Sequence, residues 1–219
     1  MAPDVFVAIC EDSVELGEWL LEFTVRESLA FASRAREAGL DIDVAVNVHA
    51  KAFDDLALPE WIEAIAAESG TPTNKVTLEI TGRSVAQNAV RMLDVATRLR
   101  LKGFNLAIDD FGTGHSGLSQ LRRLPFNQLK IDRQFVHGSA DSTSSRSVVE
   151  ASIALARNLQ MTSVAEGVQR RGDWDLLQSL GCEEMQGFFT ARPMTEDGLS
   201  AWSAQWNLHA GSNRRLVSQ

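Results

Sequence analysis

Short apolar runs alternate along the chain with longer stretches in which apolar residues recur every three or four positions. The short runs are rich in Val, Ile and Leu and are apolar at almost every position, as is typical of strands covered on both faces. They predict strands at residues 43–49, 76–81, 105–111, 128–132, 162–168 and 183–189. The alternation indicates βα units on a parallel sheet, which places the chain in the α/β class.

The longer stretches have the periodicity of amphipathic helices. They predict helices at about 15–38, 59–69, 84–101, 116–123, 145–160, 172–180 and 195–207. The Ser-rich segment 137–147 is expected to be a polar surface loop, and residues 209–219 are expected to form a flexible tail. We therefore expect one domain over residues 1–208.

Composition narrows the classes of partner. The length of 219 residues suits a single α/β barrel. A formal net charge of -8 argues against binding to long nucleic acid, although a small phosphate ligand held through metal ions is compatible with it. No export signal or membrane-spanning stretch is visible, so a cytoplasmic protein is expected, with Cys10 and Cys182 as reduced thiols.

Polar and ionisable residues stand at the end of each predicted strand. Because the carboxyl ends of parallel strands meet on one face of a barrel, these side chains are expected to converge. Any one of them alone could be a turn former, a rim ion pair or a capping amide. The set comprises Asn47, Glu79, Asp109, Asp110, Lys130, Asp132, Glu166 and Gln186.

Carboxylates crowded at one barrel mouth repel one another unless a cation neutralises them, so the set predicts a divalent metal site. Oxygen donors suit Mg²⁺, Mn²⁺ or Ca²⁺, whereas zinc prefers His and Cys. The adjacent Asp109 and Asp110 could serve two ions that activate a water molecule, and Lys130 would polarise or deprotonate that water. The glycine-rich segment 111–117 is suited to a mobile loop that closes over a ligand.

Other nucleotide and hydrolase motifs do not occur. The sequence has no G-x-G-x-x-G or G-x-x-x-x-G-K-[ST] phosphate cradle and no G-x-S-x-G nucleophile turn. Its four histidines show no H-x-x-H or H-E-x-x-H spacing. The strand-end carboxylates are therefore the main candidate for chemistry.

The series VNV, LEIT, DDFGTG, LKID, AEGV and QGF, in this order, resembles the EAL domain family, bacterial phosphodiesterases that linearise cyclic di-GMP. The resemblance runs from about Phe6 to Pro193. It implies a modified TIM barrel with one antiparallel strand that binds Mg²⁺ or Mn²⁺ and is inhibited by Ca²⁺. Members of the family often dimerise through the segment around DDFGTG.

The resemblance also implies roles for individual residues. The implied metal ligands are Asn47, Glu79, Asp109 and, for the second ion, Asp110. Catalytic roles fall to Lys130, Asp110 and Glu166, and Asp132 and Gln186 are assigned to substrate binding. The loop that borders the site contains Phe111, Gly112, Thr113 and Gly114.

Departures from the family pattern lower the expected activity. The first two strands of the family, one of which carries the Glu-Ala-Leu signature and a phosphate-binding Arg, are expected to be missing, leaving an incomplete barrel with open edges near residues 43–49 and 183–189. Gly82 and Gln169 stand where the family has Glu, and His115 and Gly117 stand where its loop has Tyr and Ser. Loss of a shared carboxylate weakens metal binding.

Three functions remain open. The first is a degenerate EAL domain that acts by contact with a partner protein or by regulated homodimerisation. The second is an active phosphodiesterase whose missing strands are supplied from elsewhere, and the third is a receptor that binds cyclic di-GMP without cutting it. The departures favour the degenerate domain.

Overall fold

The computed structural model describes residues 13–81, 89–113, 121, 123–210 and 217–218. Its strands form one sheet in the order β6-β5-β4-β3-β2-β1-β7, and every described pair is parallel. The strands are β1 (Asp43–Asn47), β2 (Val76–Thr81), β3 (Asn105–Phe111), β4 (Gln128–Ile131), β5 (Thr162–Ala165), β6 (Glu184–Met185) and β7 (Val217–Ser218). The predicted α/β class and incomplete barrel are confirmed.

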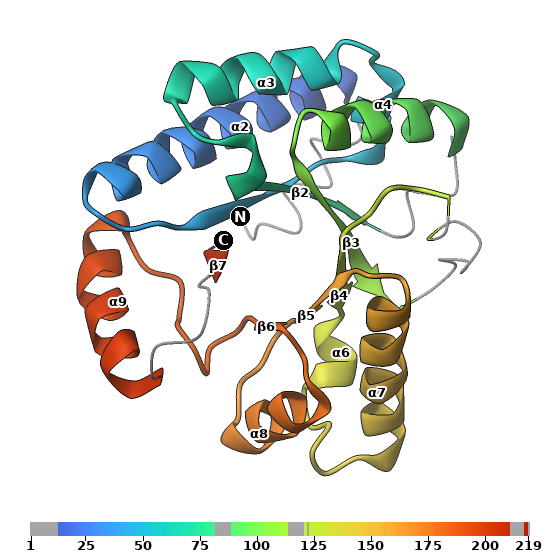
Figure 1. Ribbon diagram of the computed structural model, residues 1–219, viewed down its shortest axis with the longest axis vertical. Helices are drawn as coiled ribbons and strands as arrows, with labels where there is room; N and C mark the ends of the chain where they lie inside the picture. The colour runs from blue at the N-terminus through green and yellow to red at the C-terminus, as the bar shows by residue number, and fades with distance from the viewer. Residues whose placement is uncertain (1–12, 82–88, 114–120, 122, 211–216, 219) are drawn as a thin grey trace.

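Helices lie along the outer face of this curled sheet, with α2, α3 and α4 beside the first strands and α6, α7 and α8 beside the later ones (Figure 1). The α-helices are α2 (Val14–Glu37), α3 (Leu58–Ser69), α4 (Ala89–Leu101), α6 (Arg133–Val136), α7 (Thr143–Asn158), α8 (Arg171–Leu180) and α9 (Glu196–Ala210), with 3-10 turns η1 (Ala50–Asp54) and η2 (Thr73–Lys75). Among the described residues, no helix is both long and apolar enough to cross a bilayer.

The core forms where the strands meet the helices. Leu78 and Ile80 of β2 and Leu106 and Ile108 of β3 are almost completely buried, as expected of strands covered on both faces. Leu29 of α2 is fully buried in the same hydrophobic cluster. This packing fixes the central strands, whose carboxyl ends carry the predicted site.

The last two predicted strands are shorter in the structure than in the sequence pattern. β5 ends at Ala165 and β6 at Met185, whereas the apolar runs continue to residues 168 and 189. Gly167 and Gly187 each follow soon after with positive φ, at +67° and +151°, which turns the backbone out of the strand conformation. Polar backbone therefore borders the site at these two strand ends.

The predicted surface loop 137–147 is wrong in two respects. Helix α7 already begins at Thr143, because the Ser142 hydroxyl accepts a hydrogen bond from the Ser145 amide as an N-cap. Ser139 is completely buried and lies next to the buried carboxylate of Asp173 on α8. This short segment, which is rich in Ser, thus begins helix α7 and also contacts α8.

Helix α9 contacts both α2 and the segment that follows β6. The Arg34 side chain of α2 pairs with Glu196 of α9, and the Trp202 indole donates to the Thr190 carbonyl oxygen in the segment after β6. β7 pairs with Asp43 and Val44, so part of the predicted open edge of β1 is covered. α9 runs to Ala210, past its predicted end near residue 207.

Several predictions fall outside the described residues. They include most of the helix at 116–123, the start of the helix at 84–101, part of the tail at 209–219, and Cys10. Cys182 is a buried free thiol, as predicted, and burial raises its pKa to about 11.

Candidate functional site

Two adjacent aspartates at the end of β3 lie on the same side of the sheet edge. Neighbouring residues of a regular strand point to opposite faces. Asp110 instead has φ +53°, in the left-handed region, and its backbone amide donates to Oδ1 of Asp109 at 2.9 Å. Thr113 donates through its amide and hydroxyl to the Asp110 carbonyl oxygen, which closes the turn.

Lys130 of β4 is the centre of a buried cluster of charges. Its ammonium Nζ lies 2.6 Å from a carboxylate oxygen of Glu79, 2.7 Å from one of Glu166 and 3.6 Å from one of Asp109. The Lys130 side chain is 2% exposed. One buried cation therefore faces three carboxylates from three different strand ends.

Strand register accounts for this meeting. Glu79 stands on β2, and its register partner on β1 is Asn47, which is exposed. Lys130 on β4 is paired in register with Val164, two residues before Glu166. The structure therefore brings Glu79, Asp109, Lys130 and Glu166 into one cluster, with Asn47 at its edge.

Burial and charge shift the pKa values in this cluster. For Glu166, desolvation is the largest cause and raises the pKa to about 7; Lys130 opposes the shift and Asp109 adds to it. For Lys130, desolvation lowers the pKa, but the attraction of Glu79, Glu166 and Asp109 outweighs it and raises the pKa above its ordinary value. In the metal-free protein the Lys130 ammonium is therefore protonated near neutral pH.

Asp109, Asp110 and Glu166 form a group that could hold a metal ion. One carboxylate oxygen from each lies within 4.8 Å of the others, and all three side chains are half-buried. These donors are all hard carboxylate oxygens, without His or Cys, which is the chemistry that Mg²⁺ and Mn²⁺ prefer. The excess of carboxylates over the single Lys130 ammonium supplies the negative charge that a divalent ion would neutralise.

This group opens into a polar cleft of about 720 Å³. The lining residues are Asp110, Thr113, Asp132, Arg133, Gln134, Glu166, Gly167, Gln169, Gln186, Gly187 and Phe188. Asp132 and Gln186, predicted as substrate contacts, thus border the cleft. Asp132 also caps α6 by accepting a hydrogen bond from the Gln134 amide at 2.7 Å.

Sequence reasoning missed Arg133 and Gln134 as cleft residues. Both directly follow the strand-end residue Asp132, so a search extended beyond each strand end would have found them. Of the predicted loop residues, Thr113 lines the cleft and Phe111 and Gly112 precede it. Gly114 lies outside the described residues. A Cβ at Gly112 would come within 2.7 Å of the Phe135 ring, so only glycine fits there.

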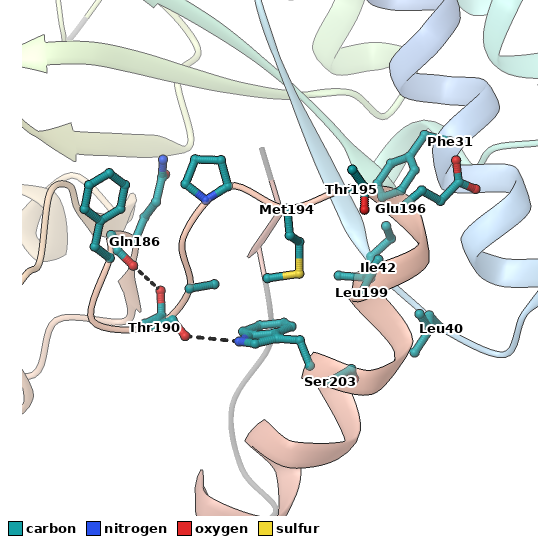
Figure 2. Close-up of a pocket in the computed structure, with 15 residues that line it drawn as sticks. Phe31, Leu40, Ile42, Gln186, Thr190, Met194, Thr195, Glu196, Leu199 and Ser203 are labelled. Atoms are coloured by element: carbon teal, nitrogen blue, oxygen red, sulfur yellow. Dashed lines mark hydrogen bonds between the residues drawn. The ribbon is translucent and has the colours of Figure 1, made fainter.

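A smaller apolar pocket of about 330 Å³ shares Gln186, Gly187 and Phe188 with the polar cleft. Figure 2 shows Gln186 and Thr190 on one side of this pocket and Phe31, Ile42 and Leu199 on the other, with Met194 between them. It lies between the two ends of the sheet. Residues 186–188 therefore form a wall common to both pockets.

Comparison with known proteins agrees with this geometry. The profile of the EAL domain family matches residues 1–193. The cyclic di-GMP phosphodiesterase RocR of Pseudomonas aeruginosa is 37% identical over 170 residues, which are 78% of this chain and 43% of RocR. The bifunctional diguanylate cyclase/cyclic di-GMP phosphodiesterase MucR of the same organism is 32% identical over 204 residues, 92% of this chain and 29% of MucR. The chain spans less than half the length of these curated relatives.

Solved structures show the same architecture. The MucR phosphodiesterase in complex with c-di-GMP matches with a TM-score of 0.81 and 32% identity, covering 91% of this chain and 81% of that one. The manganese and cyclic-diGMP complex of Klebsiella pneumoniae BlrP1 matches with a TM-score of 0.79 and 28% identity, covering 89% of this chain and 49% of that one. The fold therefore has relatives that were solved in complex with this dinucleotide.

Proposed function

Because the chain belongs to the EAL domain family, we propose that its polar cleft binds cyclic di-GMP together with Mg²⁺ or Mn²⁺. In this proposal the domain acts in the cytoplasm, in cyclic di-GMP signalling, mainly through contact with a partner protein or regulated homodimerisation, and hydrolyses the dinucleotide little. The observation that carries the ligand assignment is the grouping of Asp109, Asp110 and Glu166 beside the open cleft.

The charge of the cleft supports binding through metal ions. A phosphodiester is an anion, and the carboxylates of Asp109, Asp110, Asp132 and Glu166 would repel it at close range. Divalent ions held by Asp109, Asp110 and Glu166, with Glu79 and Asn47 available at the edge, would reverse this repulsion. The relatives crystallised with this dinucleotide support the same choice of ligand.

The residues around the ions have separable tasks. When bound, Mg²⁺ or Mn²⁺ supplies Lewis-acid polarisation of the phosphodiester and lowers the pKa of a water molecule. The protonated Lys130 holds Glu79 and Glu166 in place and can polarise a nearby oxygen. In the metal-free cluster the pKa of Glu166 is raised to about 7, so a divalent ion that binds this carboxylate near neutral pH competes with a proton.

Two departures from the family pattern support little hydrolysis. Gly82 and Gln169 replace carboxylates, and Gln169 borders the cleft. An amide at this position keeps the hydrogen-bonding shape but removes a negative charge that would favour a second metal ion. A metal ion that is poorly positioned lowers the rate of hydrolysis more than the affinity for the dinucleotide, because the transition state requires precise placement of the reacting groups.

Action by protein contact is supported by the end of the sheet. β6 consists of Glu184 and Met185 and is the last strand in the order, so one of its sides faces no other described strand. A strand edge of this kind can pair with another chain.

The second candidate is an active phosphodiesterase. It is favoured by the charged cluster, in which Nζ of Lys130 lies within 3.6 Å of carboxylate oxygens of Glu79, Asp109 and Glu166. It is also favoured by Asp110, which is adjacent to Asp109.

Binding and hydrolysis can be measured separately. Calorimetry with cyclic di-GMP and Ca²⁺ reports affinity, and chromatography of the linear product after incubation with Mn²⁺ reports turnover. We expect the wild-type chain to bind the dinucleotide and to yield product near the protein-free background. Asp110→Asn should weaken binding, whereas Asp175→Asn, on the exposed surface of α8, serves as the matched control and should not.

The outcomes separate the candidates. Robust turnover by the wild-type chain would overturn the weakly hydrolysing domain and establish the active phosphodiesterase. Absence of binding with either ion would overturn both. A change of apparent mass on adding the dinucleotide, measured by light scattering, would support regulated dimerisation, and a mass that stays constant would count against it.

A further inference from the structure

Arg133 is the single cationic side chain among the described residues that line the polar cleft. The cleft otherwise presents carboxylates, amides, backbone, a threonine hydroxyl and the exposed ring of Phe188. Lys130 lies beneath this surface, where its ammonium is occupied by Glu79 and Glu166. Among the described lining residues, Arg133 alone can therefore offer a positively charged contact to an anionic ligand.

The backbone of Arg133 is held against the end of β5. A Cβ built on Gly167 would lie 2.5 Å from Cβ of Arg133 and 3.3 Å from its Cα, so Gly167 permits a close approach that another residue would prevent. Gly167 directly follows Glu166, and Arg133 directly follows Asp132. The position of the arginine relative to the metal-binding carboxylates is thus fixed by packing.

The guanidinium of Arg133 makes no ion pair or hydrogen bond with any described residue, and the side chain is exposed. Two arginines at the start of α8 behave differently. Arg170 pairs with Asp141 and Asp173, and Arg171 pairs with Asp175. The five N–H donors of Arg133 are therefore available to a ligand in the cleft.

We propose that Arg133 contacts a phosphate of the bound cyclic dinucleotide, donating to its non-bridging oxygens from the side of the cleft formed by α6. This assignment rests on the proposed function, since it requires cyclic di-GMP in the cleft. A guanidinium matches two phosphate oxygens with two parallel N–H donors, which a lysine ammonium cannot reproduce. Arg133 is thus a binding residue, distinct from the groups that hold metal.

The positive charge of Arg133 predicts different effects of its removal on nucleotide binding and on metal binding. Removing a cation that binds phosphate weakens the affinity for the anionic dinucleotide. The same removal makes the surroundings of Asp110, Asp132 and Glu166 more negative, so the affinity for a metal ion alone stays equal or increases. A residue that merely supports the fold would weaken both together.

The experiment compares Arg133→Gln and Arg133→Lys with the matched control Arg171→Gln, in which an exposed arginine outside the cleft is replaced. Calorimetry measures cyclic di-GMP binding in saturating Ca²⁺ and, separately, Mn²⁺ binding without nucleotide. We expect Arg133→Gln to raise the Kd for the dinucleotide by roughly 10- to 100-fold. Arg133→Lys should give a smaller increase, and Arg171→Gln should match the wild type in both measurements.

Each result has one reading. If the wild type binds the dinucleotide and Arg133→Gln binds it equally well, the assignment of Arg133 fails and the proposed function stands. If Arg133→Gln loses Mn²⁺ and dinucleotide affinity together, Arg133 supports structure and the assignment also fails. If the wild type does not bind cyclic di-GMP, the proposed function is wrong, and the assignment of Arg133, which depends on it, is wrong as well.

Discussion

Asp173 and Lys130 are both buried charges, and their surroundings differ in how completely the charge is matched. Asp173 accepts hydrogen bonds from the amides of Gly138 and Ala140 at 3.1 and 3.0 Å, from the Ser139 hydroxyl at 3.4 Å, and from Arg170. Those donors lower its pKa despite the opposing effect of desolvation, which is the largest single cause. Lys130 instead faces an excess of carboxylates.

The difference distinguishes a buried charge that stabilises the fold from a buried charge that belongs to the candidate site. The donors around Asp173 are two backbone amides, the Ser139 hydroxyl and the Arg170 guanidinium, so the charge is satisfied within the fold and ties α8 to the loop before α7. The cluster at Lys130 keeps like charges close together and opens to solvent through Glu166 and Asp110. We propose that a bound cation balances this excess of negative charge, and the predictions below test the contrast by removing one charge at a time.

The largest effect is expected for Lys130→Met in metal-free protein at pH 8. Three buried carboxylates then lose their counterion, and the free energy of unfolding should fall by roughly 3–5 kcal/mol. Urea denaturation checks this, and adding Mn²⁺ or lowering the pH should restore part of the loss. Lys75→Met, which removes a partly exposed cation near Asp41 and Asp43, is the control and should cost less than about 1 kcal/mol. Equal losses in both variants would contradict the contrast.

Asp173→Ala should destabilise the fold by about 3 kcal/mol, because it leaves the buried Ser139 hydroxyl and two partly buried amides without their acceptor. Unlike the loss at Lys130, this loss should not be recovered with Mn²⁺. Asp175→Ala, on the exposed side of the same helix, should stay within about 0.5 kcal/mol of the wild type. Recovery of Asp173→Ala by metal would show that the two clusters are not independent.

The titration of Glu166 should contribute to the pH dependence of the free energy of unfolding. Its pKa is about 7 in the folded protein against an ordinary value of 4.5, so the folded state binds more protons than the unfolded state between these values. Stability of the metal-free protein should therefore fall as the pH rises from about 4.5 to 7, by up to about 2–3 kcal/mol from this group. Subtracting the curve of Glu166→Gln from that of the wild type, by urea denaturation in EDTA, isolates the effect. A flat difference would refute it.

Asp109→Asn gives the smallest expected change in free energy and the most direct test of metal binding. The substitution removes one of three clustered carboxylates and should weaken Mn²⁺ at least 10-fold, about 1.4 kcal/mol, to the limit of calorimetric detection. Asp94→Asn, on the surface of α4, should leave Mn²⁺ binding unchanged. Unaltered Mn²⁺ binding in Asp109→Asn would argue against the cluster as the metal site.

Much of the fold could be predicted, because a strand that is buried on both faces coincides with an apolar run in the sequence. The central strands β2 and β3 match their predicted ranges, since Leu78 and Leu106 lie in a core covered on both faces. The ends of β5 and β6 could not be read from hydrophobicity, because Gly167 and Gly187 end these strands by backbone conformation. The start of α7 was missed because a serine N-cap looks like loop composition.

The site was predictable to the extent that strand ends converge. Glu79, Asp109 and Glu166 meet at Lys130 as the parallel order requires. What the pattern could not supply was the protonation of Lys130, which depends on distances between side chains. Arg133 was missed because the search ended at Asp132, and its packing against Gly167 is visible only in the structure.

The left-handed turn at Asp110 has a consequence for how this position can change during evolution. A backbone with φ +53° is tolerated by Gly, Asn and Asp and disfavoured for longer side chains. Of these three residues only Asp carries charge, so replacement by Glu, which preserves the charge, is opposed by the backbone. Evolutionary change at this position should therefore lead to Asn or Gly, and either replacement would weaken the proposed metal site while leaving the fold intact.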